Sequence, residues 1–170
     1  LLCAYMLKNA GVDCILAEAG RICSGITRNT TAKITFAHGL LYDKLIKRFG
    51  QEPARLYLEA QLRAAEHYVC LCKEIPCDYE SKDSYVYSLN DRKKIEREIE
   101  ALNRLGVPAE FSETPLLPIR TAGAVCVRNQ AQFHPLKFAF ALAKELPVYE
   151  NTKVQELLPG KAITQYGEIA

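Results

Sequence analysis

The sequence predicts an α+β fold, in which an α/β part of the βαβ type is joined to an antiparallel sheet with its own helices. A near-continuous apolar run, VDCILAEAG, follows an N-terminal helical segment and is typical of a parallel strand buried on both faces. Residues 79–89 alternate like a strand, with Tyr85 and Tyr87 on one face and Val86 on the other. The segment that begins near Pro53 has one apolar stripe at helical spacing, made of Leu58, Leu62, Ala65, Val69 and Cys72.

Turn residues and periodicity predict the other elements. Pro135 opens a helix that runs to Leu146 and is apolar nearly all round, so we expect it to be deeply buried. Asn90 is expected to cap a charged helix that ends at Gly106, and whose outer face of Lys, Arg and Glu is expected to be solvated. The proline-rich segment TPLLPIR, residues 114–120, is expected to be irregular. The remaining expectations are a short helix over 39–49 and strands around 109–113, 123–127, 148–149, 153–158 and 162–166.

The composition is that of an ordinary globular protein and excludes several classes of partner. The 170 residues include 22 basic and 20 acidic side chains, with a net charge of +2. They form no basic patch in the sequence, so neither a nucleic acid nor an acidic membrane surface is expected as a partner. No apolar run has the length needed to span a bilayer, and no signal peptide is visible.

The seven cysteines do not indicate a secreted disulfide framework, because their number is odd and they are spread from Cys3 to Cys126. We interpret them as mostly buried small hydrophobic residues in a reducing cytosol, and therefore expect a cytoplasmic protein. Cys70, Cys72 and Cys77 form the one set that resembles metal ligands. On a helix the first two point about 200° apart, which argues against a shared ion, and no metal site is expected.

Both ends of the sequence have the character of an internal fragment. The opening LLCAYMLKNAG reads as the body of a helix without an initiator Met or a capping residue. The final ITQYGEIA stops where a strand begins. We therefore expect the chain to be a piece of a longer protein.

Glu18 is the sharpest local signal for a ligand. In a dinucleotide-binding βαβ unit an acidic residue ends the second strand and accepts hydrogen bonds from a ribose, about 20 residues after a glycine fingerprint. Counted back from Glu18, the last glycine of that fingerprint would fall just before Leu1, so we expect the glycine loop to be missing from this chain. The alternative is an acidic strand end that faces water.

Four segments, in order along nearly the whole chain, resemble one family. They are LAEAGRICSGIT, NTTAKITFAHGLLYDKLIKRFG, RNQAQFHPLKF and ENTKVQEL. Together they are similar to the FAD-dependent oxidoreductases of the D-amino-acid oxidase and glycine oxidase type, the DAO family. The resemblance implies an FAD cofactor. It also implies oxidation of the C–N bond of a small-molecule amine or amino acid by hydride transfer to flavin.

The resemblance also implies cofactor-binding roles along the loop that follows Glu18. Glu18 would bind the adenosine ribose, while Ala19 and Gly20 would shape the turn. Arg21 and Ser24 would lie near the adenosine and pyrophosphate portion, and Val154 would meet the adenine side through its backbone. The set that would run beside the pyrophosphate and reach the flavin ring is Thr30, Thr31, Ala32 and Lys33. The alternatives are surface charge for Arg21 and Lys33, and ordinary loop hydrogen bonding for the hydroxyls.

Candidates on the substrate side are His38, Tyr85 and Tyr87. His38 follows Lys33 closely enough to border the flavin, with a capping or surface role as the alternative. The tyrosines would line a substrate pocket, with cross-strand packing as the alternative. For His134, which precedes Pro135, we expect a structural role at a helix start. The sequence indicates no catalytic general base.

The expected domain organisation is a partial FAD-binding βαβ domain over 1–38, an inserted helical and antiparallel-sheet substrate domain over 39–146, and a return to the FAD-binding domain over 147–170. The expected function is that of an FAD-dependent amine or amino-acid oxidoreductase, with the activity belonging to the intact parent and the fragment itself inactive. The first alternative is a degenerate binding module of the same fold without redox chemistry. An NAD-linked dehydrogenase and a purely structural protein rank lower. The sequence gives no indication of the oligomeric state.

Overall fold

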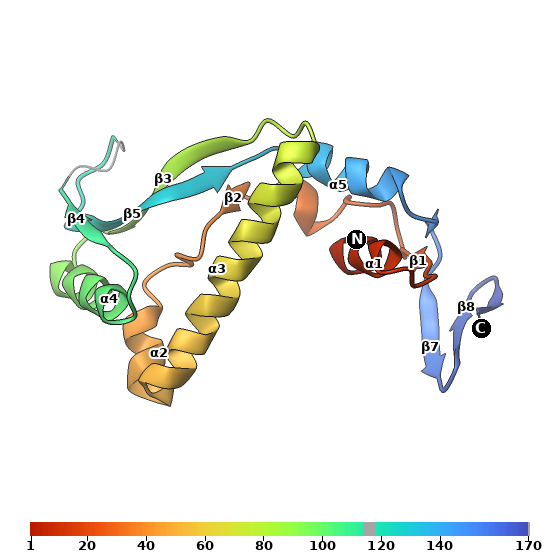
Figure 1. Cartoon of the computed structure of the whole chain (residues 1–170), viewed down its shortest axis with the longest axis horizontal. Helices are drawn as coiled ribbons and strands as arrows, with labels where there is room; N and C mark the ends of the chain where they lie inside the picture. Colours follow the sequence, from red (N-terminus) through yellow and green to blue (C-terminus); the bar gives the residue numbers. More distant parts are fainter. Residues whose placement is uncertain (114–117, 170) are drawn as a thin grey trace. The chain divides into compact units, whose positions relative to one another are not determined.

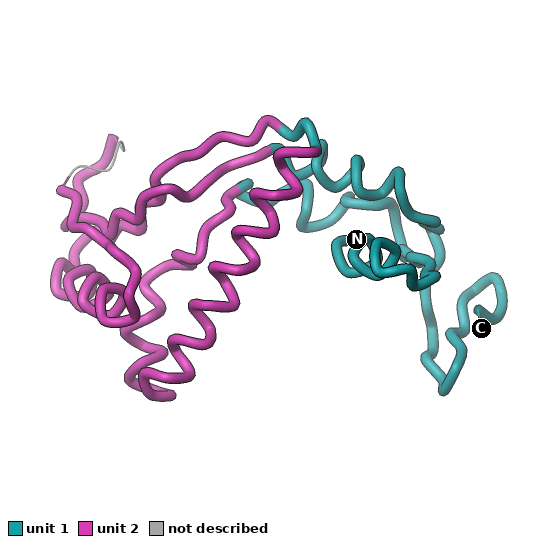
Figure 2. Tube along the Cα trace, in the orientation of Figure 1, with its two compact units in different colours: residues 1–32, 75–77, 134–170 teal, residues 33–74, 78–133 magenta. Residues whose placement is uncertain are grey.

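A computed structural model describes residues 1–113 and 118–169. It confirms the α+β fold, with helices, one parallel strand pair and two antiparallel sheets (Figure 1). The chain divides into two compact units, which Figure 2 colours separately. Unit 1 consists of Leu1–Ala32, Ile75–Cys77 and His134–Ala170, and unit 2 of Lys33–Glu74 and Asp78–Phe133. These two units are defined by structure alone. The expected division into functional domains at residues 38 and 146 remains a prediction.

Unit 1 contains the parallel strand pair. Strand β1 (Leu16–Ala17) follows helix α1 (Leu2–Asn9) and pairs in parallel with β6 (Val148–Tyr149), which follows helix α5 (Pro135–Lys144). The parallel strand predicted after the first helix is therefore confirmed. It is only two residues long in this structure, and Val12 and Ile15 of the same apolar run are exposed.

The chain after β6 forms an antiparallel sheet of its own within unit 1. Its strands are β7 (Val154–Leu158), β8 (Lys161–Thr164) and β9 (Gly167–Ile169), in that order. The first two were predicted, with slightly different bounds, whereas β9 was not. The 3-10 helix η1 (Ile26–Asn29) lies in the loop that follows β1.

Unit 2 is built around the long central strand β5 (Gly123–Gln132). It pairs antiparallel with β3 (Glu80–Ser88) along its whole length, and with β4 (Glu110–Ser112) and β2 (Lys33–Ile34) over separate stretches. The helices of this unit are α2 (Tyr42–Phe49), α3 (Gln51–Glu74) and α4 (Arg92–Arg104). Strand β5 runs five residues beyond the predicted end, because pairing with β2 and β3 continues through the polar sequence that follows Val127.

The helices of unit 2 pack on one face of this sheet. The core joins Val125 and Val127 of β5 to Ile95 and Leu102 of α4 and to Leu58 of α3. The predicted stripe of α3 is confirmed only in part as a core face, since Leu58 and Cys72 are buried while Leu62, Ala65 and Val69 are half-buried. Tyr85 and Tyr87 lie on the opposite face of the sheet from Val86, as the alternation predicted.

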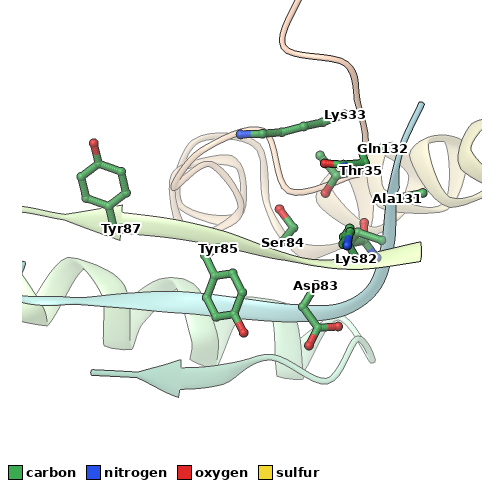
Figure 3. A pocket seen from close by; sticks show the side chains of 10 residues that line it. Lys33, Thr35, Lys82, Asp83, Ser84, Tyr85, Tyr87, Ala131 and Gln132 are labelled. Carbon is green, nitrogen blue, oxygen red and sulfur yellow. The ribbon is translucent and has the colours of Figure 1, made fainter. Parts of the chain in front are cut away.

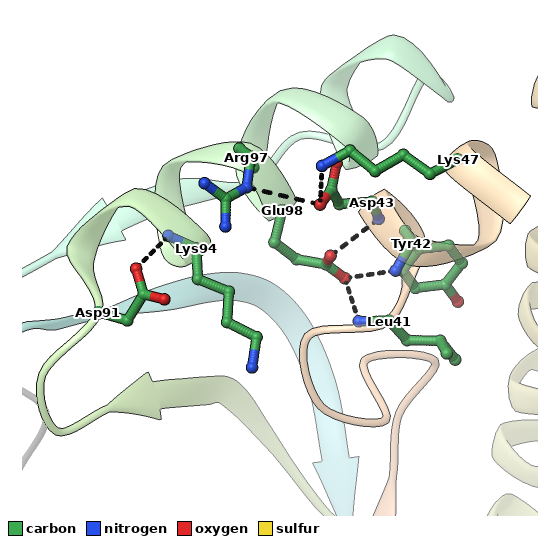
Figure 4. Close-up of polar contacts among 8 residues, drawn as sticks. All are labelled: Leu41, Tyr42, Asp43, Lys47, Asp91, Lys94, Arg97 and Glu98. Atoms are coloured by element: carbon green, nitrogen blue, oxygen red, sulfur yellow. Dashed lines mark hydrogen bonds and ion pairs between the residues drawn. The ribbon is translucent and has the colours of Figure 1, made fainter.

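A buried carboxylate ties α4 to the start of α2 (Figure 4). Glu98 is 2% exposed, and its Oε1 accepts hydrogen bonds from the backbone N–H groups of Leu41 at 2.8 Å and Tyr42 at 2.7 Å. Its Oε2 accepts a third bond, from the N–H of Asp43 at 3.0 Å. The first amides of a helix have no partner within the helix, so this carboxylate supplies the N-terminal cap of α2. The outer face of Lys, Arg and Glu was expected to be solvated, and Glu98 is a buried exception among the charged residues of α4.

Two further local expectations need correction. The cap of α4 is Asp91 rather than Asn90, since the Asp91 carboxylate accepts a hydrogen bond from Lys94 N at 2.9 Å, while Asp91 N donates to Ser88 Oγ. Helix α5 is not buried all round, because Phe140 is 44% exposed in this chain.

The cysteines are less buried than expected. Cys72, Cys77 and Cys126 are buried, but Cys3 and Cys70 are exposed, and all seven are free thiols. Residues 114–117 of the segment predicted to be irregular lie outside the described residues. In the described part of the chain, no helix combines the length and apolar character that crossing a membrane requires.

Candidate functional site

Glu18 stands at the carboxyl end of the parallel strand pair in unit 1. Its backbone N–H donates to Tyr149 O at 2.9 Å, and its carbonyl accepts a bond from Thr152 N at 2.8 Å. These bonds continue the ladder beyond β1 and fix Glu18 next to the chain that leaves β6. In open α/β sheets, ligands bind at the carboxyl ends of the strands.

The Glu18 carboxylate is oriented by the turn that follows it. Its Oε1 accepts a hydrogen bond from Gly20 N at 2.8 Å. A carboxylate has about four acceptor positions, so this one bond orients the group and leaves it able to accept from ribose hydroxyls. A Cβ atom at Gly20 would lie 3.7 Å from Glu18 Oε1 and 3.9 Å from Ser24 Oγ, which means that the glycine leaves a small hollow between two polar oxygens.

The loop after Gly20 is anchored to the chain after β6. Asn151 N donates to Gly20 O at 2.8 Å, and Ile22 N donates to Glu150 Oε1 at 2.8 Å. Ser24 Oγ donates to Arg21 O at 2.7 Å. The hydroxyl proton of Ser24 is thus committed to the loop itself, so Ser24 offers a phosphate no donor in this conformation.

The structure places the other predicted cofactor residues along the same chain segments. Thr30 and Thr31 are exposed after η1, and Ala32 has a left-handed backbone with φ of 61°. Val154 begins β7 directly after the anchored turn. Unit 1 therefore gathers Glu18, Ala19, Gly20, Arg21 and Ser24 at one strand end, with Val154 two residues beyond Thr152.

Lys33 belongs to unit 2, where it lines a cavity of about 300 Å³ with both predicted tyrosines (Figure 3). The wall combines Lys33 and Thr35 with β3 residues that include Ser84, Tyr85 and Tyr87 and with the end of β5. Figure 3 shows the Lys33 side chain extended alongside β3. Three residues predicted from two separate segments of the sequence thus meet in one cavity.

A β-bulge shapes the wall of this cavity. The register between β3 and β5 shifts between Lys82 and Ser84, where Asp83 faces two residues of β5, and Asn129 there has a φ of 58°. Asp83 Oδ1 accepts a hydrogen bond from Asn129 N at 3.2 Å. Bulges of this kind bend a strand and re-aim its side chains. Gln130 follows the bulge and lines the cavity.

Charged side chains beside the bulge are paired. Arg128 lies 3.6 Å from Asp83 and 2.8 Å from Glu110, and this guanidinium holds the pKa of Glu110 below its usual range. The pKa of Tyr85 is raised, first by its hydrogen bond with Cys126 and then by the charge of that group.

The histidines lie elsewhere. His38 is exposed, its Nε2 is 3.2 Å from Gln61 Oε1 of α3, and it is not among the residues that line the cavity. His134 caps α5, because its Nδ1 accepts a hydrogen bond from Lys137 N at 3.3 Å, so the structural role expected for it is confirmed. The role of His38 beside a flavin remains a prediction.

The sequence did not indicate Asp83 and Gln130 as residues of the cavity wall, or Arg128 as the partner of Asp83 beside the bulge. The segment RNQAQ was noted only for its family resemblance. The feature of this segment that could have indicated a bulge is an Asn within a polar stretch where the alternation of apolar and polar residues breaks down. Asn adopts the left-handed conformation of a bulge more readily than most residues. The partner of the bulge, Asp83, lies 46 residues away in the chain.

An acidic residue at the end of a parallel strand is typical of the nucleotide-binding α/β class of proteins. Residues 1–169 match the family described as FAD dependent oxidoreductase (DAO). The chain belongs to this family, whose cofactor is FAD.

A curated relative is similar over most of this chain. The chain is 34% identical over 167 residues to YhfW of Bacillus subtilis (strain 168), a protein whose given name is that of a Rieske 2Fe-2S iron-sulfur protein. The match covers 93% of this chain and 33% of that relative. The chain thus spans about a third of the curated relative.

Solved structures share the fold at low identity. Glycine oxidase from Geobacillus kaustophilus superposes with a TM-score of 0.72 at 16% identity, over 98% of this chain and 49% of that one. L-proline dehydrogenase from P. horikoshii gives a TM-score of 0.71 at 21% identity, over 98% and 46%. The chain therefore spans about half the length of these oxidoreductases.

The residues present fit the adenosine end of FAD. The evidence is the Glu18 carboxylate, held by one backbone amide with acceptor capacity to spare, and the hollow that Gly20 leaves beside it. The chain contains no G-x-G-x-x-G sequence. In dinucleotide-binding folds that loop brings backbone amides to the pyrophosphate at a helix N-terminus, so this chain carries only part of a cofactor site.

Proposed function

We propose that the protein carrying this chain is an FAD-dependent oxidoreductase that oxidises the C–N bond of an amine or amino acid. The observation that carries the proposal is the oriented carboxylate of Glu18 at the end of a parallel strand, in a chain whose family uses FAD. The similarity in fold to a glycine oxidase and a proline dehydrogenase supports an amine-bearing substrate.

Each predicted residue then has a physical task. Glu18 accepts hydrogen bonds from the adenosine ribose, and Gly20 keeps the space beside it open. Thr30 and Thr31 offer hydroxyls to the pyrophosphate, where neutral donors bind phosphate oxygens without a strong charge. Bound flavin supplies the acceptor for a hydride from the carbon that bears the amine. The protein supplies position and excludes water.

The experiment uses the protein expressed from its complete reading frame. Under anaerobic conditions the flavin spectrum is followed while amino acids, amines and the matching 2-hydroxy acids are added in turn. Bleaching by an amine-bearing compound, with release of ammonia, supports C–N oxidation. Bleaching only by hydroxy acids would contradict the proposal, and a protein that binds no FAD would favour the degenerate binding module.

The name of the Bacillus relative suggests where the electrons go next. We propose that an iron–sulfur cluster, carried by other parts of the longer protein, takes the two electrons of the reduced flavin one at a time and passes each to a further one-electron acceptor. Among the described residues, no group of three or more His, Cys, Asp or Glu side chains is placed to hold a metal. Electron paramagnetic resonance of the complete protein after substrate addition tests this, since a reduced cluster signal is expected and its absence would leave another acceptor.

A further inference from the structure

A side-chain amide continues the short ladder that holds strand β2 on the sheet of unit 2. Strand β2 is two residues long and pairs with Ala131 and Gln132 of β5. Directly beyond it, the N–H of Phe36 donates to the side chain of Gln130, with 3.3 Å between Phe36 N and Gln130 Oε1. The side chain of Gln130 thus supplies the acceptor that a backbone carbonyl would supply in a longer strand.

The same side chain also satisfies the β-bulge of β5. Gln130 Nε2 donates to Arg128 O at 3.1 Å, where the register between β5 and β3 shifts. One primary amide therefore donates to the bulge and accepts from the chain that follows β2. A carboxylate of the same length would keep the acceptor without the donor, and a methionine side chain offers only a weakly accepting sulfur.

The turn that follows β2 is buried and held by polar contacts. Phe36 and Ala37 are both buried. Ala37 N donates to Thr35 Oγ1 at 3.0 Å, and Phe36 O accepts a bond from the Tyr42 hydroxyl at 2.8 Å. Among these contacts, Gln130 supplies the one that ties the turn to β5. Because a buried N–H without a partner is unfavourable, removal of the Gln130 amide favours a displaced turn.

Residues 33–36, which we call the partition, separate two cavities of unit 2. Successive side chains of an extended chain point to opposite sides. Lys33 and Thr35 line the cavity of about 300 Å³ that contains both tyrosines. The other two side chains of the partition line a second cavity, of about 340 Å³, together with residues of α3. Gln130 lines both cavities, so its amide lies at the boundary between them.

We propose that Gln130 is a positioning residue for the substrate cavity. Its two hydrogen bonds fix the partition, and the partition fixes Lys33 and Thr35 in the cavity wall. Without these bonds the turn after β2 moves into the free space of the second cavity, and the wall of the first cavity moves with it because the chain is continuous. The inference rests on the proposed function in one respect, namely that this cavity receives the amine-bearing substrate.

The test is anaerobic stopped-flow reduction of the flavin in the complete protein, with the amine-bearing compound that bleaches the flavin in the experiment above. In Gln130→Met the substrate concentration that gives half the maximal rate is expected to rise about fivefold or more. The limiting rate is expected to stay within about twofold, because the wall holds the substrate and takes no part in the reaction. Gln130→Glu keeps an acceptor for Phe36 N, so a smaller rise is expected. Gln51→Met makes the same chemical change at an exposed residue of α3 and is expected to match the wild type.

Hydrogen exchange measures the partition without any substrate. The amides of residues 34–38 are expected to exchange faster in Gln130→Met than in Gln51→Met, because the contact with β5 is lost. Circular dichroism of each variant verifies that the protein is folded.

The possible results separate this inference from the proposed function. Unchanged exchange at residues 34–38 in Gln130→Met would show that Gln130 does not hold the partition. Faster exchange with an unchanged half-maximal concentration would show that the partition does not shape substrate binding. A fall in the limiting rate alone, or an equal change in Gln51→Met, would indicate a general loss of structure. Each of these results would overturn the inference and leave the oxidoreductase proposal in place, whereas a wild type whose flavin no amine-bearing compound reduces would overturn both.

Discussion

Replacement of Glu98 by Ala is predicted to destabilise unit 2 more than any other single change of a charged residue in α4. The side chain is 2% exposed and accepts three backbone hydrogen bonds at the start of α2 (Figure 4). A hydrogen bond to a charged group contributes about 1.5–3 kcal/mol net. The three bonds share one carboxylate, and Leu41 and Asp43 are only half-buried, so water replaces part of the loss.

The expected decrease in the free energy of unfolding is therefore about 3–5 kcal/mol for Glu98→Ala. Glu98→Gln keeps one oxygen that accepts hydrogen bonds and loses the charge, so a decrease of about 1–2 kcal/mol is expected. Glu100→Ala is the control on the same helix, because Glu100 is exposed and such changes stay within about 0.5 kcal/mol.

Urea unfolding followed by circular dichroism measures these differences. Hydrogen exchange provides a local readout, since the amides of residues 41–43 are expected to exchange faster in Glu98→Ala than in Glu100→Ala. Equal unfolding free energies for the two alanine variants, with unchanged exchange at residues 41–43, would refute the reasoning that Glu98 caps α2.

Three further predictions concern single positions. Burial raises the pKa of Tyr42 well above its usual value of about 10, so the stability it contributes is fully present below about pH 10 and falls as the pH rises beyond it. In a pH series of urea unfolding, Tyr42→Phe should lose less stability above about pH 10 than the wild type, and an equal loss would contradict this. Gly123→Ala should lower the free energy of unfolding by more than about 2 kcal/mol, roughly twice as much as Gly160→Ala or more. Both glycines have a left-handed backbone, but only at Gly123 would the new Cβ clash with the Phe111 ring. Equal midpoints in thermal unfolding of the two variants would contradict this. Ala32→Gly should stabilise the chain by about 0.5–1 kcal/mol, since glycine relieves the left-handed strain at φ 61°, and a lowered unfolding midpoint would show that no strain is stored there.

Local patterns predicted those features that depend on neighbours in the sequence. The apolar run after the first helix predicted a parallel strand, and the alternation around Val86 predicted which face Tyr85 and Tyr87 occupy. Both depend on side-chain periodicity, which a strand or helix displays without knowledge of its partner.

Features that depend on distant partners were missed or misplaced. Glu98 looks like any solvated glutamate of a charged helix until α2 is packed against it, more than 50 residues away in the chain. The end of β5 has no alternation, and only pairing with β2 and β3 keeps residues 128–132 extended. Phe140 belongs to a helix apolar on all sides, and this chain buries only one of those sides.

In the candidate sites too, some features follow from local sequence and others depend on distant partners. Glu18 was predictable because an acidic residue after a buried strand has a known ligand role, and its orientation by Gly20 adds the geometry. Lys33 was predicted as a cofactor residue from its segment alone. Its meeting with Tyr85 and Tyr87 in one cavity depends on the pairing of β2 with β5, which no local pattern encodes.

We propose that the Glu18 strand end binds FAD in the complete protein. The most direct measurement is titration of the complete apoprotein with FAD, with Glu18→Ala and Asp13→Ala as a matched pair, because Asp13 is an exposed acidic residue just before the same strand. FAD is expected to bind to the wild type and to Asp13→Ala with equal affinity, and at least tenfold more weakly to Glu18→Ala. Equal affinity in all three proteins, or no binding in any of them, would show that Glu18 does not bind FAD.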